Sequence, residues 1–405
     1  MAKKSSFICP FCFEQSKLSA AEFRCTNRRC TEIDDIPMTK YLGGDTSMPE
    51  KGRMCFKSPS TNPFLVPSAA SCPSCKQSTR KVVCPACHNS LPESTLSGKD
   101  MIISVVGSRD AGKSLFVGVL INELIKRIAV KFEGSMVGFD DSYKRYTDNH
   151  HRSLYIDRRL MEQTTTVLTN AVGSHAYKPY IFTLSLKKKK GFLGLGSEIQ
   201  CFTFVFFDTA GEDLNELDTM STVNKYICKS AGIIFLLDPM KIPAVSGQVD
   251  SSILAGASNT TVIAQADDIM GRVSQLIRND RNMKETQKID IPVAAVFSKF
   301  DAIESLVPPG ATVLEPSAHC AEKAFLMSDW HNVNQEIQGL LAEWGEEAFM
   351  AQLDVNYDKY SFFTASALGL NNNPRNGGFE MPRPHRIEDA LLWILKENGV
   401  IKPKK

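Results

Sequence analysis

Short apolar runs, most of them followed by small or polar residues, recur along the last three quarters of the chain. Runs of this kind are typical of strands buried in a parallel sheet. They predict strands at residues 101–106, 202–207, 233–237 and 293–297, with a further strand around residues 362–363. Residues 180–186 alternate in polarity along one face, which predicts an antiparallel edge strand.

Apolar positions at helical spacing separate these runs. They predict helices at residues 115–128, 158–162, 329–352 and 386–397. The last helix is followed by Asn398 and Gly399, a pair typical of helix C-termini. Strands that alternate with helices favour an α/β fold with a mostly parallel sheet.

Cysteines are concentrated near the N-terminus, where nine of the twelve precede residue 90. Close cysteine pairs outside a thioredoxin-like context are more typical of metal binding than of redox chemistry. A tetrahedral zinc ion takes four thiolates, so we expect two zinc sites. In chain order the ligands would be Cys9, Cys12, Cys25 and Cys30 for the first site, and Cys72, Cys75, Cys84 and Cys87 for the second. Cys55 and His88 are alternative ligands that we expect to be bystanders.

A phosphate-binding motif follows the predicted strand at residues 101–106. Residues 107–114 read Gly-Ser-Arg-Asp-Ala-Gly-Lys-Ser and lead into a predicted helix, the strand–loop–helix setting that this motif requires. Backbone N–H groups of such a loop and the N-terminus of the helix favour binding of phosphate. Lys113 is expected to reach the β- and γ-phosphates, and Ser114 is expected to ligate Mg²⁺. The nucleotide contacts expected here are Gly107, Asp110, Ala111, Gly112, Lys113, Ser114 and Leu115.

Two later motifs favour GTP over ATP. Lys299 and Asp301 follow the strand at 293–297, where a carboxylate can accept two hydrogen bonds that guanine offers and adenine does not, and where the lysine stem can pack along the base. Backbone amides of Ser366, Ala367 and Leu368 are candidates to recognise the guanine carbonyl.

In this order the motifs resemble those of the Ras-like and translation-factor-related P-loop GTPases, over roughly residues 99–402. The resemblance implies a Ras-like α/β domain, with helices flanking a mostly parallel sheet, that hydrolyses GTP to GDP and phosphate. Asp208 is then expected to hold Mg²⁺ through water, and the Gly211 amide to sense the γ-phosphate. Ser298 departs from the usual Asn or Thr.

The cysteine-rich opening and the closing helix at residues 388–395 resemble a bacterial zinc-ribbon "double-GTPase" family. That resemblance implies a regulatory switch in multi-component bacterial conflict or antiviral systems. We therefore expect a first zinc ribbon at 1–45, a linker at 46–71, a second zinc knuckle at 72–90, and a P-loop GTPase domain with insertions at 99–402.

The catalytic residues expected for hydrolysis are Lys113, Glu212 and Arg109. Glu212 stands where many relatives carry a water-orienting Gln, and its charge would repel the γ-phosphate, so intrinsic hydrolysis should be slow. Arg109 is a candidate charge donor or a solvent-facing arginine. The second Mg²⁺ ligand is expected to be Thr169, with Thr165 and Thr166 as alternatives.

The net charge of +2 gives no whole-chain attraction to nucleic acid or membrane. No apolar stretch is long enough to span a bilayer and no signal peptide opens the sequence, so a cytoplasmic location is expected. The leading hypothesis is a GTP-hydrolysing switch whose zinc head recruits a protein partner, with homo-oligomers possible. The alternatives are an adaptor that binds GTP with negligible hydrolysis, and a ribosome- or RNA-associated GTPase.

Overall fold

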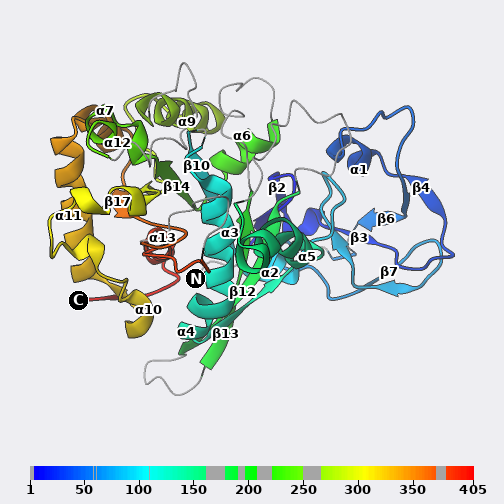
Figure 1. The fold of residues 1–405 in the computed structure, drawn as a ribbon. Helices are drawn as coiled ribbons and strands as arrows, with labels where there is room; N and C mark the ends of the chain where they lie inside the picture. The colour runs from blue at the N-terminus through cyan, green and yellow to red at the C-terminus, as the bar shows by residue number, and fades with distance from the viewer. Residues whose placement is uncertain are drawn as a thin grey trace.

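The computed structural model describes residues 4–57, 59–60, 62–108, 110–160, 178–189, 197–207, 221–249, 266–370 and 380–405. The protein is of the mixed α/β class, with a cysteine-rich head beside a body built on one large sheet (Figure 1). Figure 1 shows the head, in blue, on the side of the body where α2, β12 and β13 lie, with α11 and α12 on the far side.

The central sheet has seven strands in the order β11-β12-β13-β10-β14-β15-β17. In this order, each strand from β13 to β17 is parallel to the next. Strand β12 pairs antiparallel with β13, and β11 pairs antiparallel with β12. The strands are β10 (Lys99–Gly107), β11 (Gly134–Gly138), β12 (Tyr180–Lys189), β13 (Ser197–Phe206), β14 (Gly232–Leu237), β15 (Val293–Phe297) and β17 (Tyr360–Thr364). All five strands predicted from apolar runs belong to this sheet, and the expectation of a mostly parallel sheet is confirmed.

The expected edge position of residues 180–186 is wrong. Strand β12 pairs with β13 on one side and with β11 on the other, so β11 forms that edge of the described sheet. Strand β11 has only five residues and a glycine at each end, which gives little strand signal in the sequence.

Alternate residues of the parallel strands enter two buried clusters on opposite faces of the sheet. Ile102 and Phe235 belong to one cluster, and Ile103 and Leu236 to the other. Helices of the body cover these faces: α2 (Glu93–Ser97), α3 (Lys113–Glu123), α4 (Ala129–Lys131), α5 (Ser142–Tyr146), α6 (Ser221–Cys228), α7 (Pro243–Ser246), α9 (Ala266–Arg281), α10 (His319–Glu322), α11 (Met327–Glu343), α12 (Glu347–Asn356) and α13 (Asp389–Glu397).

Shorter elements complete the body. The π-helical turns η2 (Leu124–Ile128) and η3 (Thr147–Asp157) extend α3 and α5, and the strands β16 (Phe325–Leu326) and β18 (Pro403–Lys404) form a small separate pair. Single turns are η7 (Pro239–Lys241), η8 (Phe300–Ala302), η9 (Glu304–Leu306) and η10 (Thr312–Leu314).

The helix predicted across residues 329–352 is two helices. Helix α11 ends at Glu343, Gly345 adopts a φ of 80°, and α12 begins at Glu347. A left-handed glycine is a common helix terminator, and it lets the second helix turn back onto the sheet.

The head consists of short strands around cysteine turns. Its elements are β1 (Ser6–Ile8), β2 (Gln15–Lys17), η1 (Leu18–Ala20), β3 (Glu22–Arg24), β4 (Glu32–Asp34), α1 (Ile36–Tyr41), β5 (Lys51–Arg53), β6 (Cys55–Lys57), β7 (Ala70–Ser71), β8 (Ser78–Thr79) and β9 (Val82–Val83). Strand β3 pairs with β6 and with β9. Because of this pairing, residues before 58 and residues after 70 form one layer.

Candidate metal centres and phosphate-binding loop

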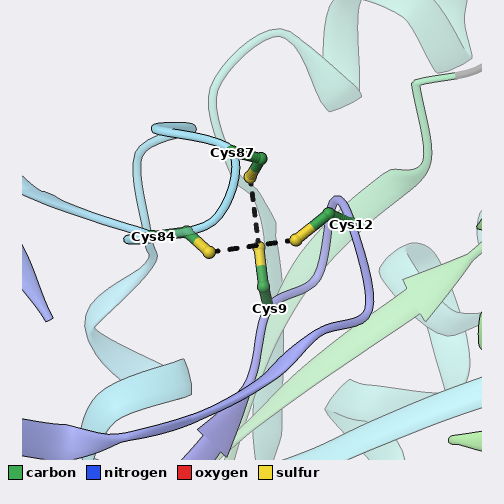
Figure 2. A group of neighbouring side chains, drawn as sticks. All are labelled: Cys9, Cys12, Cys84 and Cys87. Atoms are coloured by element: carbon green, nitrogen blue, oxygen red, sulfur yellow. Dashed lines mark hydrogen bonds between the residues drawn. The ribbon is translucent and has the colours of Figure 1, made fainter. Parts of the chain in front are cut away.

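The first cysteine cluster joins the two ends of the head. Cys9 and Cys12 come from the turn after β1, and Cys84 and Cys87 from the turn after β9 (Figure 2). The sulfurs of Cys9 and Cys87 are 3.7 Å apart, and those of Cys12 and Cys84 are 3.8 Å apart. Four sulfurs about 2.3 Å from one tetrahedral zinc ion would be separated by about 3.8 Å, so this cluster fits zinc.

The second cluster has the same dimensions. It contains Cys25, Cys30, Cys72 and Cys75. The sulfurs of Cys25 and Cys75 are 3.6 Å apart, and those of Cys30 and Cys72 are 3.8 Å apart. Two four-cysteine groups compatible with two zinc ions are therefore present, as the sequence predicts.

The expected grouping of the ligands along the chain is wrong. Cys9 and Cys12 share a centre with Cys84 and Cys87 rather than with Cys25 and Cys30, and Cys72 and Cys75 complete the other centre. The physical reason is the pairing of β3 with both β6 and β9, which folds the second cysteine-rich stretch back against the first. Each centre therefore draws ligands from both of the modules expected at residues 1–45 and 72–90.

Two amide groups donate hydrogen bonds to sulfurs of the first centre. The amide of Ala86 and the side-chain amide of Asn89 donate to the sulfurs of Cys84 and Cys87, each at 3.4 Å. Burial raises the pKa of the Cys9 thiol well above its usual value. Four thiolates in such a place need a compensating cation, which a divalent zinc ion would supply.

The phosphate-binding loop lies between β10 and α3. Gly107 ends the strand where an added Cβ would stand 2.7 Å from the Leu236 carbonyl, so only glycine fits. Asp110 and Gly112 have φ values of 62° and 79°, and α3 begins at Lys113. Left-handed backbone positions of this kind occur in anion-binding loops.

Lys113 reaches back across this loop. Its ammonium donates to the carbonyls of Gly107, at 3.0 Å, and Ser108, at 2.8 Å, and the side chain is largely buried. The positive charge of Lys113 therefore lies against the turn that follows β10. Ala111, Ser114 and Leu115 follow the same turn into α3, so the described residues of the predicted phosphate site are together.

The residues expected to select the base form a second group. The Ser366 hydroxyl donates to the Asp301 carboxylate at 2.6 Å, while the Ser366 amide donates to the His385 carbonyl at 3.0 Å. Burial raises the pKa of Asp301, and the Ser366 hydrogen bond opposes that shift. Ala367 and Leu368 continue the same loop after β17.

Asp238 is a site residue to which the sequence reasoning gave no role. Its buried carboxylate accepts from the Lys299 ammonium at 2.7 Å, and Lys299 has a φ of 54°. The sequence does contain a signal for this role: Asp238 directly follows an apolar run that predicts a strand, as do the candidate site residues that follow positions 297 and 364. The Ser298 hydroxyl donates to the Leu237 carbonyl at 3.0 Å and ties the same two strand ends together.

Five predictions of catalytic, Mg²⁺-binding or γ-phosphate-sensing residues lie outside the described residues. They are Arg109, Thr169 with its alternatives Thr165 and Thr166, Asp208, Gly211 and Glu212.

No protein-family model matches this chain. The chain is similar to a protein of Mycolicibacterium smegmatis described as "Putative ESX-1 scaffolding and assembly protein SaeC". The two are 24% identical over 346 residues, which cover 79% of this chain and 80% of that protein. Among the helices that the structure describes, none is long and apolar enough to cross a bilayer.

Proposed function

We propose that this chain is a Ras-like P-loop GTPase that works as a molecular switch. The observation that carries the proposal is the placement of both predicted nucleotide groups at one edge of the sheet. The strands β10, β14, β15 and β17 are adjacent and parallel, and they end at Gly107, Leu237, Phe297 and Thr364. Each strand end is followed by a candidate group: the phosphate loop after β10, Asp238 after β14, Lys299 with Asp301 after β15, and Ser366 after β17. Ligands of open α/β sheets bind at this carboxyl edge.

Selection of guanine would depend on Asp301. A carboxylate held by the Ser366 hydroxyl is oriented before the base arrives, so little ordering remains on binding. Adenine lacks the two N–H groups that would donate hydrogen bonds to this carboxylate. A buried carboxylate without hydrogen-bond donors costs free energy, so adenine would bind more weakly. Lys299, fixed by Asp238, would lay its stem along the base.

Hydrolysis would use the phosphate loop together with residues beyond the described ranges. Bound Mg²⁺ would neutralise charge on the β- and γ-phosphates, with Ser114, Asp208 and Thr169 as its protein ligands. Lys113 would hold the phosphates, and Glu212 would orient the attacking water. Arg109 is the candidate for charge stabilisation from within the loop.

The output of the switch is proposed to be the assembly of a multi-protein machine. The similar mycobacterial protein is described as a scaffolding and assembly protein, and nucleotide-dependent docking through the zinc head would be one way to time such assembly. A bacterial conflict or antiviral system remains the context that the family resemblance implies. The second candidate is an adaptor that signals by GTP occupancy alone, favoured by the same description because scaffolding needs no turnover.

Calorimetry on zinc-loaded full-length protein with GTP, GDP and ATP tests the nucleotide proposal. We expect binding of GTP and GDP, no comparable heat with ATP, and at least tenfold weaker GTP binding by Lys113→Ala. Asp301→Ala should weaken GTP binding while sparing the triphosphate contacts.

A preference for ATP would reject the role of Asp301, and no binding of any nucleotide would reject the whole proposal. Release of phosphate in single-turnover assays then separates a hydrolysing switch from an occupancy adaptor.

A further inference from the structure

A third group of metal-ligating side chains lies in the head, apart from the two four-cysteine centres. Asp35 precedes α1, Cys55 begins β6, and His88 follows Cys87 in the second knuckle. One ligand atom from each lies within 4.8 Å of the others. Asp35 and His88 are buried, so three distant parts of the chain place these groups together in the interior.

The imidazole of His88 is held between two carboxylates. Its Nδ1 is 2.6 Å from an oxygen of Asp35, and its Nε2 is 3.3 Å from an oxygen of Glu22. A histidine that binds a metal through one nitrogen commonly donates the other N–H to a carboxylate, which fixes the ring. The short contact to Asp35 fits that orienting role, which leaves Nε2 as the nitrogen available for a metal.

The distance between His88 Nε2 and the Glu22 oxygen fits two ligands of one metal ion. Nitrogen and oxygen ligands about 2.0–2.1 Å from a tetrahedral zinc ion would be about 3.3 Å apart. Glu22 and Cys55 lie on the same face of the β3–β6 pair, because Arg24 is directly opposite Cys55 and Glu22 is two residues away along β3. Each of the two approaches His88: the Cys55 sulfur lies within 4.8 Å of a ring nitrogen, and a Glu22 oxygen lies 3.3 Å from Nε2.

The charges also fit a divalent cation. Arg24 donates to the other oxygen of Asp35 at 2.6 Å and to the His88 carbonyl at 3.1 Å, so the charge of Asp35 already has a partner. The Glu22 carboxylate and a Cys55 thiolate would add two negative charges beside a neutral imidazole. A divalent ion would balance those two charges, and this donor set suits zinc or cobalt.

We propose that Cys55, His88 and Glu22 form a third metal centre of the zinc class, with Asp35 orienting His88. Three protein ligands leave the fourth tetrahedral position open to water or to a ligand group. The four-cysteine centres have no such position, so among the metal-ligating groups in the described part of the head the third centre is the one that can exchange a ligand.

The test is the metal content of the full-length protein after loading with excess Zn²⁺ or Co²⁺ and removal of free metal. We expect three ions per chain in the parent protein and two in Cys55→Ser, His88→Gln and Glu22→Gln. Cys201→Ser, a matched change on β13, should keep three. The two ions retained by the head variants show that their four-cysteine centres, and therefore the head, still fold.

Cobalt spectra add a second measurement. The bands lost in Cys55→Ser and in His88→Gln should be the same and should be weaker than those of a four-thiolate centre. A parent protein that holds two ions while Cys9→Ser and Cys25→Ser each hold one would overturn the proposal and identify the group as a hydrogen-bonded network. Three ions in both the parent and Cys55→Ser would also overturn it.

Discussion

Phe13, in the turn that carries Cys9 and Cys12, packs edge-on against Phe207, which directly follows strand β13, with ring centroids 6.1 Å apart. Phe13 directly follows Cys12, has a φ of 57° and is fully buried. Its ring also contacts Tyr226 of α6, at 5.3 Å, and the Tyr226 hydroxyl accepts from the Phe207 amide. The first metal centre is therefore continuous with the core of the body.

Replacement of Phe13 by alanine should destabilise the whole chain rather than the head alone. A buried phenylalanine truncated to alanine typically costs about 3–5 kcal/mol, because the cavity adds to the lost burial. The rings that pack against Phe13 belong to the body, next to β13 and on α6, so unfolding of the body should shift together with unfolding of the head. Urea denaturation followed by tryptophan fluorescence, which reports on the body, measures this effect.

Phe64→Ala is the matched control, since Phe64 lies in the head but is 49% exposed. Its effect should stay within about 0.5 kcal/mol, as for most surface changes. An unchanged midpoint for the body in Phe13→Ala would show that the head is energetically independent.

The crossed ligand sets predict an unusual pattern of metal loss. Cys9→Ser and Cys84→Ser should each remove the same zinc ion, so the double variant should lose no more metal than either single variant. Cys9→Ser combined with Cys25→Ser should lose both four-cysteine ions, although those residues are closer in the chain. Metal analysis of these four variants decides between this pattern and grouping by sequence order, which predicts the reverse.

The sheet and the phosphate loop were predictable because their signals are local. Residues 101–106 form an apolar run, and the glycines at 107 and 112 are required by a close approach and a left-handed φ that other residues do not tolerate. The position of Asp301 at the end of such a run was visible for the same reason. Its hydrogen bond to Ser366 joins residues that are 65 positions apart, so the sequence alone did not predict this contact.

The candidate zinc ligands show the limit of sequence reasoning. The eight cysteines were identifiable by their spacing, but which pairs share an ion depends on how β3 pairs with β6 and β9. His88 was expected to be a bystander, and its partners Asp35 and Glu22 lie more than fifty residues away in the chain. Long-range partners of this kind leave no local pattern.

The hydrogen bond from Ser366 to Asp301 predicts a specific effect on nucleotide affinity. Ser366→Ala removes the donor that orients the carboxylate, and a hydrogen bond to a charged group contributes about 1.5–3 kcal/mol. We expect GDP to bind at least tenfold more weakly, and the folded protein to lose stability as well, because the buried Asp301 carboxylate and the Gly369 amide each lose a partner. Ser97→Ala, an exposed serine that bonds its own helix, should leave the affinity unchanged.

Calorimetric titration of GDP into both variants gives the comparison. If Ser366→Ala bound GDP as tightly as the parent protein, Asp301 would need no orientation by this hydroxyl.

A buried arginine joins the C-terminal helix to α11. The Arg386 guanidinium donates to Asp329 at 3.0 Å and to Asp389 at 2.8 Å, and its side chain has no exposed surface. Arg386→Ala would leave the buried Asp389 carboxylate and the partly buried Asp329 carboxylate without their cation, and loss of one partner of a buried ion pair typically costs about 3–5 kcal/mol. Lys323→Ala breaks an exposed pair with Glu133 and should cost about 1 kcal/mol or less. Thermal and urea unfolding of both variants measures the difference, and equal losses would contradict the role given to Arg386.

His150 is buried behind the phosphate-loop helix. Its ring lies against Gly118 of α3 and stacks on Tyr146, and its Nε2 is 3.0 Å from the Tyr180 hydroxyl. The Arg145 guanidinium lies over the ring of Tyr180, 5.0 Å from its centroid, so a positive charge lies on that side. Burial lowers the pKa of His150 from 6.5 to about 4, and the folded protein therefore keeps this imidazole neutral.

This pKa predicts the direction in which acid destabilises the protein. Between about pH 6.5 and pH 4 the unfolded chain binds a proton at His150 that the folded chain does not, so stability falls as the pH drops through this window. The loss should reach about 2 kcal/mol by pH 5 and vanish above about pH 7. His150→Phe should flatten the profile between pH 7 and pH 5, whereas replacement of the exposed His331 by Phe should leave its slope unchanged. Urea denaturation at half-unit pH intervals measures both slopes. A parent protein equally stable at pH 7 and pH 5 would mean that His150 takes up its proton without unfolding the helices packed on α3.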